Sequence, residues 1–257
     1  MKICVLSSGS GGNSVYIETD EYKILLDAGL SEKKLSARLA GIDRNAGDLD
    51  AVFVTHEHSD HVKGVGPLVR KHNIPLYTTE GTLKKIQNRL GRVPVWHPIR
   101  SEEPVTLGDM AIEPYATPHD AEESVAFVIR HAGVKIGHAT DLGKVTPFVR
   151  EKLQKSTALL VEANHDVEML TVGPYPWSLK QRVKSDVGHL SNEACGELLA
   201  AVDHDGLRCV VLMHLSETNN LPELAALTAE QALGRRSSPP RMILARQDHT
   251  TELLTID

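Results

Sequence analysis

The sequence predicts a protein of the α/β class, and three observations support this prediction. Short apolar runs separated by turn residues dominate the first part of the chain. Segments of strand type and helix type alternate in the second part. Histidine and aspartate follow directly after several apolar runs, as in folds that place their chemistry where strands end. Composition alone favours a two-sheet α/β sandwich only slightly over a doubly wound sheet.

Short apolar runs bounded by turn residues are expected to form the strands. In chain order these runs are residues 3–6, 15–17, 24–26, 51–54, 75–78, 111–115, 125–129, 135–138, 158–161, 209–213, 242–244 and 252–256. Helical spacing of apolar residues predicts helices over 31–39, 82–90, 146–153, 191–202 and 221–233. Ser31 and Thr146 are typical N-cap residues, and Pro147 suits a first helical position.

The chain has 257 residues, of which 41% are hydrophobic, so it can bury a full core without disulfides. We expect one domain over residues 1–257, because no linker or repeat divides the sequence. Every apolar run is far shorter than the roughly 18 residues that cross a bilayer, and the N-terminal segment lacks the apolar stretch of a signal peptide. Three cysteines, an odd number, do not suit a secreted disulfide framework. The sequence therefore favours a cytoplasmic protein with no membrane association.

Histidine is the unusual feature of the composition. The chain has 13 histidines, and imidazole both binds metals and titrates near neutral pH. The net charge of −6 argues against a protein that coats nucleic acid electrostatically. The count alone does not show whether the histidines bind metal, so their positions in the sequence have to indicate this.

The segment His-Glu-His-Ser-Asp-His, residues 56–61, follows a predicted buried strand. Residues i and i+2 of extended backbone point the same way, so His56 and His58 can bind one ion. Asp60 and His61 come next and can face a second ion beside the first. Imidazole and carboxylate without thiolate suit Zn²⁺, Mn²⁺ or Fe²⁺. The segment therefore predicts two divalent metal ions, Zn²⁺ or Mn²⁺ foremost, and adjacent metal pairs are common in hydrolases.

The pattern His-x-His-x-Asp-His resembles that of the metallo-β-lactamase superfamily, and further segments match in order along nearly the whole chain. The resemblance implies a four-layer αβ/βα sandwich with a dimetal cleft between its sheets. It implies that Asp27 supports the metal loop without binding metal, and that His119 completes the ligand set of His56 and His58. It further implies that Asp141 bridges both ions and that His214 joins Asp60 and His61 at the second ion.

Each downstream residue also has an ordinary structural explanation when it is taken alone. His119 and Asp141 could be turn residues, and His214 could be a core histidine at a strand end. Many β-lactamases of this superfamily carry cysteine where this chain has Asp141, so antibiotic hydrolysis is not expected. The cysteines, Cys4, Cys195 and Cys209, occur in apolar segments and are expected to be small core residues.

Within the superfamily the chain most resembles the bacterial YycJ/WalJ branch. The segments that carry this resemblance are 7–14, 117–121, 162–166, 188–192, 214–216 and 219–220. The resemblance implies a hydrolase of phosphodiesters, a 5′-to-3′ exonuclease on DNA, with RNA as a further substrate to test. The nucleophile is expected to be a metal-bridging hydroxide that Asp60 holds, because metal coordination brings the pKa of bound water toward about 7.

A proton donor is expected beside the metals. Gly188-His189-Leu190-Ser191 and Glu162 resemble elements of ribonuclease Z, which processes tRNA 3′ ends and in which a glutamate orients a histidine that protonates the leaving alcohol. A positioned general acid contributes about 10²–10⁴-fold to the rate. We therefore expect a catalytic Glu162/His189 pair. The alternative is that His189 caps the helix that begins near Ser191 and has a packing role.

The residues expected to contact the substrate lie in three segments: Ser10 and Asn13; His165; and Tyr175, Trp177, Lys180 and Arg182. Aromatic residues interleaved with cations suit single-stranded nucleic acid, although an exposed amphipathic connector has the same pattern. The Gly-rich turn around Ser10 and Asn13 can offer N–H groups to a phosphate, and a simple hairpin turn is an equally good explanation. His165 is expected to line the cleft.

Two other functions stay open from the sequence. The first alternative is a small-molecule ester hydrolase such as a lactonase, thioesterase or cyclic-nucleotide phosphodiesterase, which would not need the Glu162/His189 pair. The second is a metal-binding regulatory protein without turnover, which the complete ligand set disfavours. Asp141 and His214 are too close in sequence for the large second domain that some nucleases of the superfamily insert there. Substrate recognition would then come from this domain, from a partner or from a homodimer.

Overall fold

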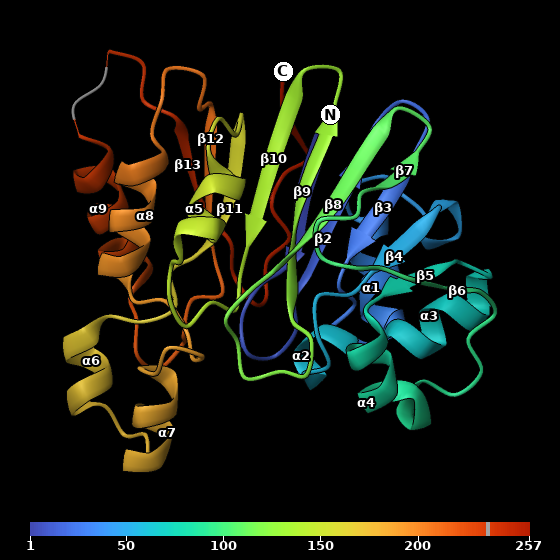
Figure 1. Cartoon of the computed structure of the whole chain (residues 1–257), viewed down its shortest axis with the longest axis horizontal. Coiled ribbons are helices and arrows are strands. Elements are labelled where there is room, and N and C mark those ends of the chain that lie inside the picture. The colour runs from blue at the N-terminus through green and yellow to red at the C-terminus, as the bar shows by residue number, and fades with distance from the viewer. Residues whose placement is uncertain (235–236) are drawn as a thin grey trace.

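The computed structural model describes residues 1–234 and 237–257, in which two seven-stranded sheets pack face to face (Figure 1). Helices cover the outer face of each sheet, so the layers run helix, sheet, sheet, helix (Figure 1). This arrangement confirms the α/β class and the four-layer sandwich expected from the sequence. No helix of the described residues is long and apolar enough to cross a membrane.

The first sheet contains the N-terminal strands and one short strand from the C-terminus. In spatial order its strands are β14 (Leu254–Thr255), β1 (Lys2–Ser7), β2 (Ser14–Glu18), β3 (Lys23–Leu26), β4 (Ala51–Phe53), β5 (Leu76–Thr78) and β6 (Trp96–Pro98). The strands from β14 to β3 pair antiparallel, and those from β3 to β6 pair parallel. The carboxyl ends of β3 and β4 therefore reach the same edge of the sheet.

The second sheet has the same division into an antiparallel part and a parallel part. In spatial order its strands are β13 (Arg241–Leu244), β12 (Cys209–Met213), β11 (Ala158–Glu162), β10 (Val134–Ala139), β9 (Val125–His131), β8 (Met110–Ala116) and β7 (Val105–Leu107). The strands from β10 to β13 pair parallel, and β7 to β10 pair antiparallel. As a result β8, β10, β11 and β12 run in one direction and end at one edge.

The helices lie in two outer layers and at the lower edge of the sandwich. Those of the first half are α1 (Glu32–Ala40), the 3₁₀-helix η1 (Ala46–Asp48), α2 (Ser59–Val62), α3 (Val65–His72) and α4 (Glu80–Leu90). Those of the second half are α5 (Pro147–Leu153), α6 (Val167–Val172), α7 (Trp177–Val183), α8 (Asn192–Val202) and α9 (Pro222–Leu233). Segment 167–184, which we call the helical excursion, carries α6 and α7 and projects at the lower left of Figure 1.

Side-chain alternation along the strands divides the core into three layers. Along β12, Cys209, Val211 and Met213 face the space between the sheets. Val210 and Leu212 face the opposite way, toward the helical layer of α8 and α9. Strands buried on both faces have nearly continuous apolar sequences, which is why β12 reads CVVLM. Both sheets are therefore rigid supports for the loops that leave their ends.

The sequence predicted the strongly periodic elements and missed the short ones. Side chains of Ser31, Thr146 and Ser191 accept hydrogen bonds from N–H groups in the first turns of α1, α5 and α8, as N-caps do. Strands β6 and β7 and helices α2, α3, α6 and α7 were not predicted. Gly66 and Pro67 interrupt the pattern of α3, while Gly173, Pro174 and Pro176 flank the short helices of the excursion.

Candidate active site

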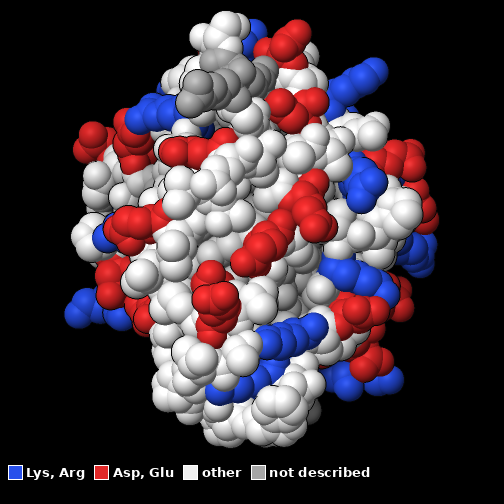
Figure 2. Space-filling view, turned by 90° about the vertical axis from the view of Figure 1, so that its left-hand side faces the viewer, with Lys and Arg blue, Asp and Glu red and all other residues white. Residues whose placement is uncertain are grey.

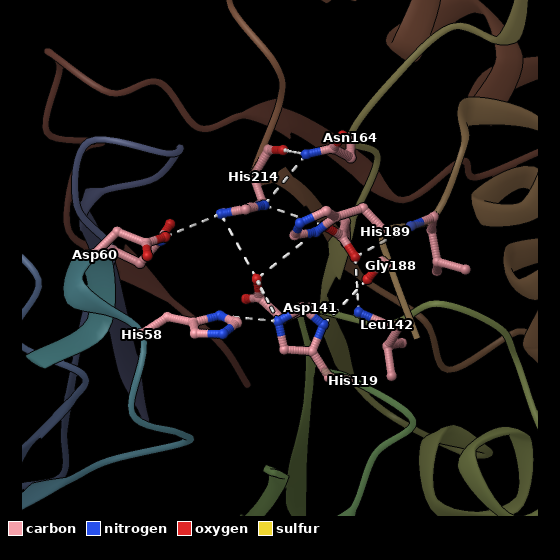
Figure 3. Close-up of polar contacts among 12 residues, drawn as sticks. His58, Asp60, His119, Asp141, Leu142, Asn164, Gly188, His189 and His214 are labelled. Carbon is pink, nitrogen blue, oxygen red and sulfur yellow. Dashed lines mark hydrogen bonds and ion pairs between the residues drawn. The ribbon is translucent and has the colours of Figure 1, made fainter. Parts of the chain in front are cut away.

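Polar side chains from both sheets meet at the edge where the parallel strands end. The strands β3, β4, β8, β10 and β12 are followed within three residues by a histidine or an aspartate of this edge, and Glu162 is the last residue of β11. The side chains that converge there are those of His56, His58, Asp60, His61, His119, Asp141, Glu162, His189 and His214. Figure 3 shows His58 and Asp60 from one sheet facing His119, Asp141 and His214 from the other.

The first group of candidate ligands consists of three histidines. Nε2 of His56 lies 3.0 Å from Nδ1 of His58, and Nε2 of His119 lies 3.2 Å from the same atom. Ligand atoms about 2.0–2.1 Å from a tetrahedral ion stand roughly 3.3 Å from one another. The spacing of these three nitrogen atoms therefore fits one ion.

The second group combines histidines with carboxylates. Nε2 of His61 lies 3.3 Å from Oδ2 of Asp60 and 3.3 Å from Oδ2 of Asp141. Nε2 of His214 lies 3.5 Å from Asp60 Oδ2 and 3.8 Å from Asp141 Oδ1. Asp141 Oδ1 is also 3.9 Å from Nε2 of His119, which belongs to the first group. Asp141 thus stands between the two groups, where it can bridge two ions.

The residues present fit a pair of divalent cations. Asp141 is buried, and its Oδ2 makes no hydrogen bond with any described residue. A buried carboxylate oxygen in this state costs free energy that a cation beside it would offset. Imidazole nitrogens and carboxylate oxygens are ligands that both Zn²⁺ and Mn²⁺ accept. A divalent metal centre is consistent with both the geometry and the chemistry of the donors.

The other ring nitrogen of most of these histidines is held by an oxygen atom. Nδ1 of His61 donates to Asp27 Oδ2 at 2.7 Å, and Nδ1 of His119 donates to the Gly188 carbonyl at 3.1 Å. Nδ1 of His56 lies 2.9 Å from Thr55 Oγ1. Such partners fix the ring orientation and the tautomer that presents Nε2 to a metal. Asp27 therefore contacts the metal loop from outside, as the sequence resemblance implied.

Backbone strain is concentrated at the same place. Asp27, Asp141 and His214 adopt φ values of 58°, 57° and 56°, in the left-handed region that non-glycine residues seldom occupy. Each such backbone conformation raises the free energy of the folded state by on the order of 1–3 kcal/mol, and it persists where surrounding contacts hold the residue in place. Asp27 and His214 directly follow a strand, and Asp141 follows one after a single residue, so the chain turns sharply and aims each side chain into the cluster.

The cluster alternates positive and negative charge. Burial lowers the pKa of His61, but the carboxylates of Asp141, Asp27 and Asp60 outweigh burial and raise this pKa well above its usual value. Burial likewise raises the pKa of Asp141, but His214 and His61 outweigh it and hold that pKa well below its usual value. Divalent cations bound here would replace the imidazolium protons as the positive partners of the carboxylates.

Glu162 and His189 form a pair beside the cluster. Oε1 of Glu162 accepts from Nδ1 of His189 at 2.7 Å and lies 3.1 Å from Nδ1 of His214. Oε2 accepts from the N–H groups of Leu142 and Leu190. Burial raises the pKa of Glu162, but His189 outweighs burial and the pKa falls to about 2. Glu162 is therefore an ionised acceptor that orients His189 and leaves its Nε2 available.

A pocket of about 380 Å³ opens above these residues. Asp60, His189 and His214 line it, together with Tyr175 and Arg182 of the helical excursion. His189 is not the N-cap of α8, since Ser191 occupies that position. The side chain of His189 is 18% exposed, so it can reach a molecule bound in the pocket.

The structure brings three of the seven predicted substrate-contacting residues to this pocket. Ser10, Tyr175 and Arg182 line it. Nε of Arg182 donates to Asp120 Oδ2 at 2.5 Å, which ties α7 to the loop of His119. Leu179, which the sequence did not single out, also lines the pocket, as does Ser216 of segment 214–216.

The structure does not bring the other four to the pocket lining. Asn13 is buried, and its Nδ2 donates to Asp60 Oδ2 at 3.0 Å, so it supports the metal loop. His165 is also buried, packed beside Asn164 within the loop after β11. Trp177 is on the outside of the helical excursion, and Nζ of Lys180 donates to the Thr171 carbonyl. Helical periodicity explains the last two positions, because residues 177 and 180 face away from residues 179 and 182.

Two supporting residues were missed by sequence reasoning. Ser8 Oγ accepts from the backbone N–H of His214 at 2.7 Å. Asn164 Nδ2 donates to the His214 carbonyl at 2.8 Å (Figure 3). Both residues fall inside segments that the family resemblance highlights, but no local pattern indicates that they hold His214. The contact of Ser8 joins the two sheets, and that of Asn164 joins the ends of the neighbouring strands β11 and β12.

The comparisons with known proteins agree with this geometry. A family model described as a beta-lactamase superfamily domain matches residues 22–215. The chain is 41% identical over 231 residues to the exodeoxyribonuclease YycJ of Bacillus anthracis, covering 89% of this chain and 88% of that one. It is 41% identical over 238 residues to the exodeoxyribonuclease WalJ of Streptococcus pneumoniae, covering 91% and 88%.

Among solved structures, the metallo-beta-lactamase fold protein YhfI from Bacillus subtilis superposes with a TM-score of 0.74. The two chains are 18% identical, and the match covers 97% of this chain and 98% of the other. At that level of identity the likeness concerns the fold. The family model and the curated relatives go further, and they show that this chain belongs to the metallo-β-lactamase superfamily, in the family of the exodeoxyribonucleases YycJ and WalJ.

Proposed function

We propose that the protein is a metal-dependent exonuclease that hydrolyses DNA from the 5′ end. The observation that carries the proposal is the Glu162/His189 pair, which faces a pocket beside two groups of metal-ligand type. The names of the curated relatives, exodeoxyribonucleases, support the same activity and the same substrate. We propose the metal ligands to be His56, His58, Asp60, His61, His119, Asp141 and His214.

Divalent ions held by these ligands would polarise a phosphodiester and lower the pKa of water beside it. Asp60, at the pocket wall, accepts a hydrogen bond from the attacking water and so orients it. His189 donates a proton from Nε2 to the leaving oxygen of the phosphodiester. Glu162 holds the opposite nitrogen, stabilises the imidazolium and keeps the ring in this orientation.

Arg182 is placed to bind a phosphate of the substrate. Its Nε is occupied by Asp120, so the guanidinium is held in one orientation at the pocket wall. The terminal N–H groups of an arginine held in this way suit the oxygens of a phosphate. The pocket volume of about 380 Å³ lies within the range of sites for single small ligands, which supports binding of one terminal nucleotide.

Several finer points belong to the proposal. We take the ions to be Zn²⁺ or Mn²⁺ and the preferred substrate to be DNA over RNA. The protein is proposed to act in the cytoplasm, where its buried free cysteines, Cys4, Cys195 and Cys209, would stay reduced. Organisation as one domain, and a homodimer as a source of further substrate contacts, stay predictions. An ester hydrolase is disfavoured, because it would not need the Glu162/His189 pair as a proton donor.

The test uses purified protein loaded with Mn²⁺ or with Zn²⁺. Single- and double-stranded DNA and RNA, labelled at either the 5′ or the 3′ end, are offered beside generic ester substrates. We expect stepwise release of mononucleotides from the 5′ end of DNA. Release from the 3′ end would overturn the polarity, and hydrolysis of esters alone would overturn the nuclease assignment.

A further inference from the structure

The helix α7 has two different faces. Its inner face carries Leu179 and Arg182, which line the catalytic pocket. Its outer side carries Trp177, which is 74% exposed, and Val172 at the end of α6 is 83% exposed. These are the two most exposed of the large hydrophobic side chains in the described part of the chain. An exposed tryptophan beside a site offers a flat aromatic ring on which another molecule can stack.

The same surface is positively charged in a protein that is acidic as a whole. Lys180 and Lys184 lie in residues 169–185, a segment without aspartate or glutamate that Glu168 and Asp186 flank, whereas the whole chain has a net charge of −6. Nζ of Lys180 donates to the Thr171 carbonyl at 2.7 Å, and Nζ of Lys184 donates to Thr171 Oγ1 at 2.6 Å. Figure 2 shows Lys and Arg side chains together on the lower part of this side of the molecule, with uncharged surface below them.

We propose that this surface, formed by Val172, Trp177, Lys180 and Lys184 and called here the outer face, is a second binding site for single-stranded DNA. A base of the strand outside the catalytic pocket stacks on Trp177, and the two lysines contact the adjacent phosphates. The inference rests on the proposed function and extends it, because it assigns a contact to nucleotides that are not being cleaved. An aromatic platform flanked by cations is how proteins bind single strands without sequence preference.

The charge pattern favours nucleic acid over a second copy of the chain. In a two-fold dimer through the outer face, each patch would meet itself, so that Lys180 and Lys184 would approach their own symmetry mates. Like charges brought together in this way oppose association. A strand of DNA has the opposite charge and also supplies the base that an exposed tryptophan can cover.

The outer face is rigidly connected to the catalytic residues. The N–H of His189 donates to the Val183 carbonyl at the end of α7. A Cβ atom on Gly188 would lie 2.2 Å from the Arg182 carbonyl and 2.3 Å from that of Val183, so the chain packs tightly there. From Trp177 to Val183 the helix rises about 9 Å. A strand held at Trp177 would therefore be held at a constant position relative to His189.

Tryptophan fluorescence tests the proposal without turnover. The chain has two tryptophans, Trp96 and Trp177, so the Trp96→Phe variant reports on Trp177 alone. The metal-loaded protein is titrated with a phosphorothioate oligothymidylate that resists hydrolysis. We expect the emission of Trp177 to be quenched on binding, and the quenching to disappear in Trp177→Phe. Phenylalanine still stacks, so this variant should bind the oligonucleotide more tightly than Trp177→Ala does.

The affinities give a second and independent measure. Stacking of one base contributes about 1–3 kcal/mol, so Trp177→Ala should raise the Kd at least about fivefold. Leu227→Ala, which removes a half-exposed side chain from α9, is the matched control and should leave the Kd unchanged. Changing both Lys180 and Lys184 to Gln should reduce the slope of log K against log salt by about 1.4, or about 0.7 for each phosphate contact.

Two outcomes would overturn the inference. One is unchanged Kd in Trp177→Ala together with fluorescence of Trp177 that does not respond to DNA. The other is a wild-type dimer that Trp177→Ala converts to a monomer, measured by analytical ultracentrifugation. This result would identify a second copy of the chain as the occupant of the outer face. If the wild-type protein degrades DNA and Trp177 has no effect, only this inference fails. If the wild-type protein neither binds nor degrades DNA, the proposed function itself fails.

Discussion

Gln247 and Gly11 are 236 residues apart in sequence, yet Oε1 of Gln247 accepts a hydrogen bond from the Gly11 N–H at 2.6 Å. Nε2 of the same glutamine donates to Ser7 Oγ at 2.7 Å and to the Gly12 carbonyl at 2.9 Å. The loop that is held in this way continues into Asn13, which donates to Asp60. One side chain near the C-terminus therefore supports the metal centre through a glycine-rich loop.

We expect Gln247→Ala to weaken metal binding by about tenfold, at the lower end of the effect seen for residues that orient metal ligands. The loop would lose three hydrogen bonds, and Asn13 would no longer be held against Asp60. Gln247→Glu is the matched variant, because its carboxylate accepts from Gly11 but cannot donate to Ser7 or Gly12. Competition with a metal-binding dye measures the affinity. Equal metal affinity in the wild type and in both variants would contradict this role.

His189→Ala should lower kcat on DNA by about 10²-fold or more while the metal content stays intact. The reason is chemical: an alkoxide leaves poorly unless a proton reaches it. A substrate whose leaving group is p-nitrophenolate needs no such proton, so the variant should hydrolyse bis(p-nitrophenyl) phosphate almost as fast as the wild type. Equal losses on both substrates, or loss of metal measured by elemental analysis, would exclude His189 as the donor.

Asp60→Asn and His58→Ala should each abolish hydrolysis and reduce the metal content. His58 is central to the three-histidine group, and Asp60 lies 3.3 Å from His61 and 3.5 Å from His214. Removal of metal from the wild type by a chelator should have the same effect on activity, and added Mn²⁺ or Zn²⁺ should restore it. Activity that persists in metal-free protein would falsify the proposed chemistry.

Glu18 makes stability depend on acid pH at a place away from the metal centre. Its oxygens bind Nε and Nη2 of Arg44 at 2.5 and 2.6 Å and accept from the Tyr16 hydroxyl at 2.6 Å. The hydrogen bond to Arg44, with burial opposing it, lowers the pKa of Glu18 from 4.5 to about 2. Because the pKa is lower in the folded state, the stabilisation is complete above about pH 4.5 and is lost as the pH falls toward 2.

Glu18→Gln should therefore reduce the free energy of unfolding by up to roughly 3 kcal/mol near pH 7. The difference from the wild type should shrink as the pH falls from 5 to 2. Urea denaturation with chelator present throughout removes any contribution of bound metal from the comparison. A difference that does not change over this pH range would show that Glu18 does not stabilise the fold through its charge.

Sequence reasoning singled out residues that the structure brings together where each one closely follows a strand. Asp141 lies two residues after the end of β10, and His214 lies one residue after the end of β12, so the sheet itself brings them to one edge. Strand direction and side-chain alternation are local properties, and this is why spacing and family resemblance were sufficient there. Asn13 and His165, which lie in loops, were expected to contact the substrate and are in fact buried. Whether a polar loop residue faces a pocket or the residues behind it depends on packing.

The amino-acid sequence by itself determined the alternation of strands and helices, the candidate ligands and the family, because these depend on patterns that are local along the chain. Only the tertiary structure decided which residues act together. It placed Gln247 against Gly11, Ser8 against His214, and the two faces of α7 toward the pocket and toward solvent. The physical reason is that hydrogen bonds and burial depend on distances in space, and the packing of two sheets brings together residues that no local pattern connects.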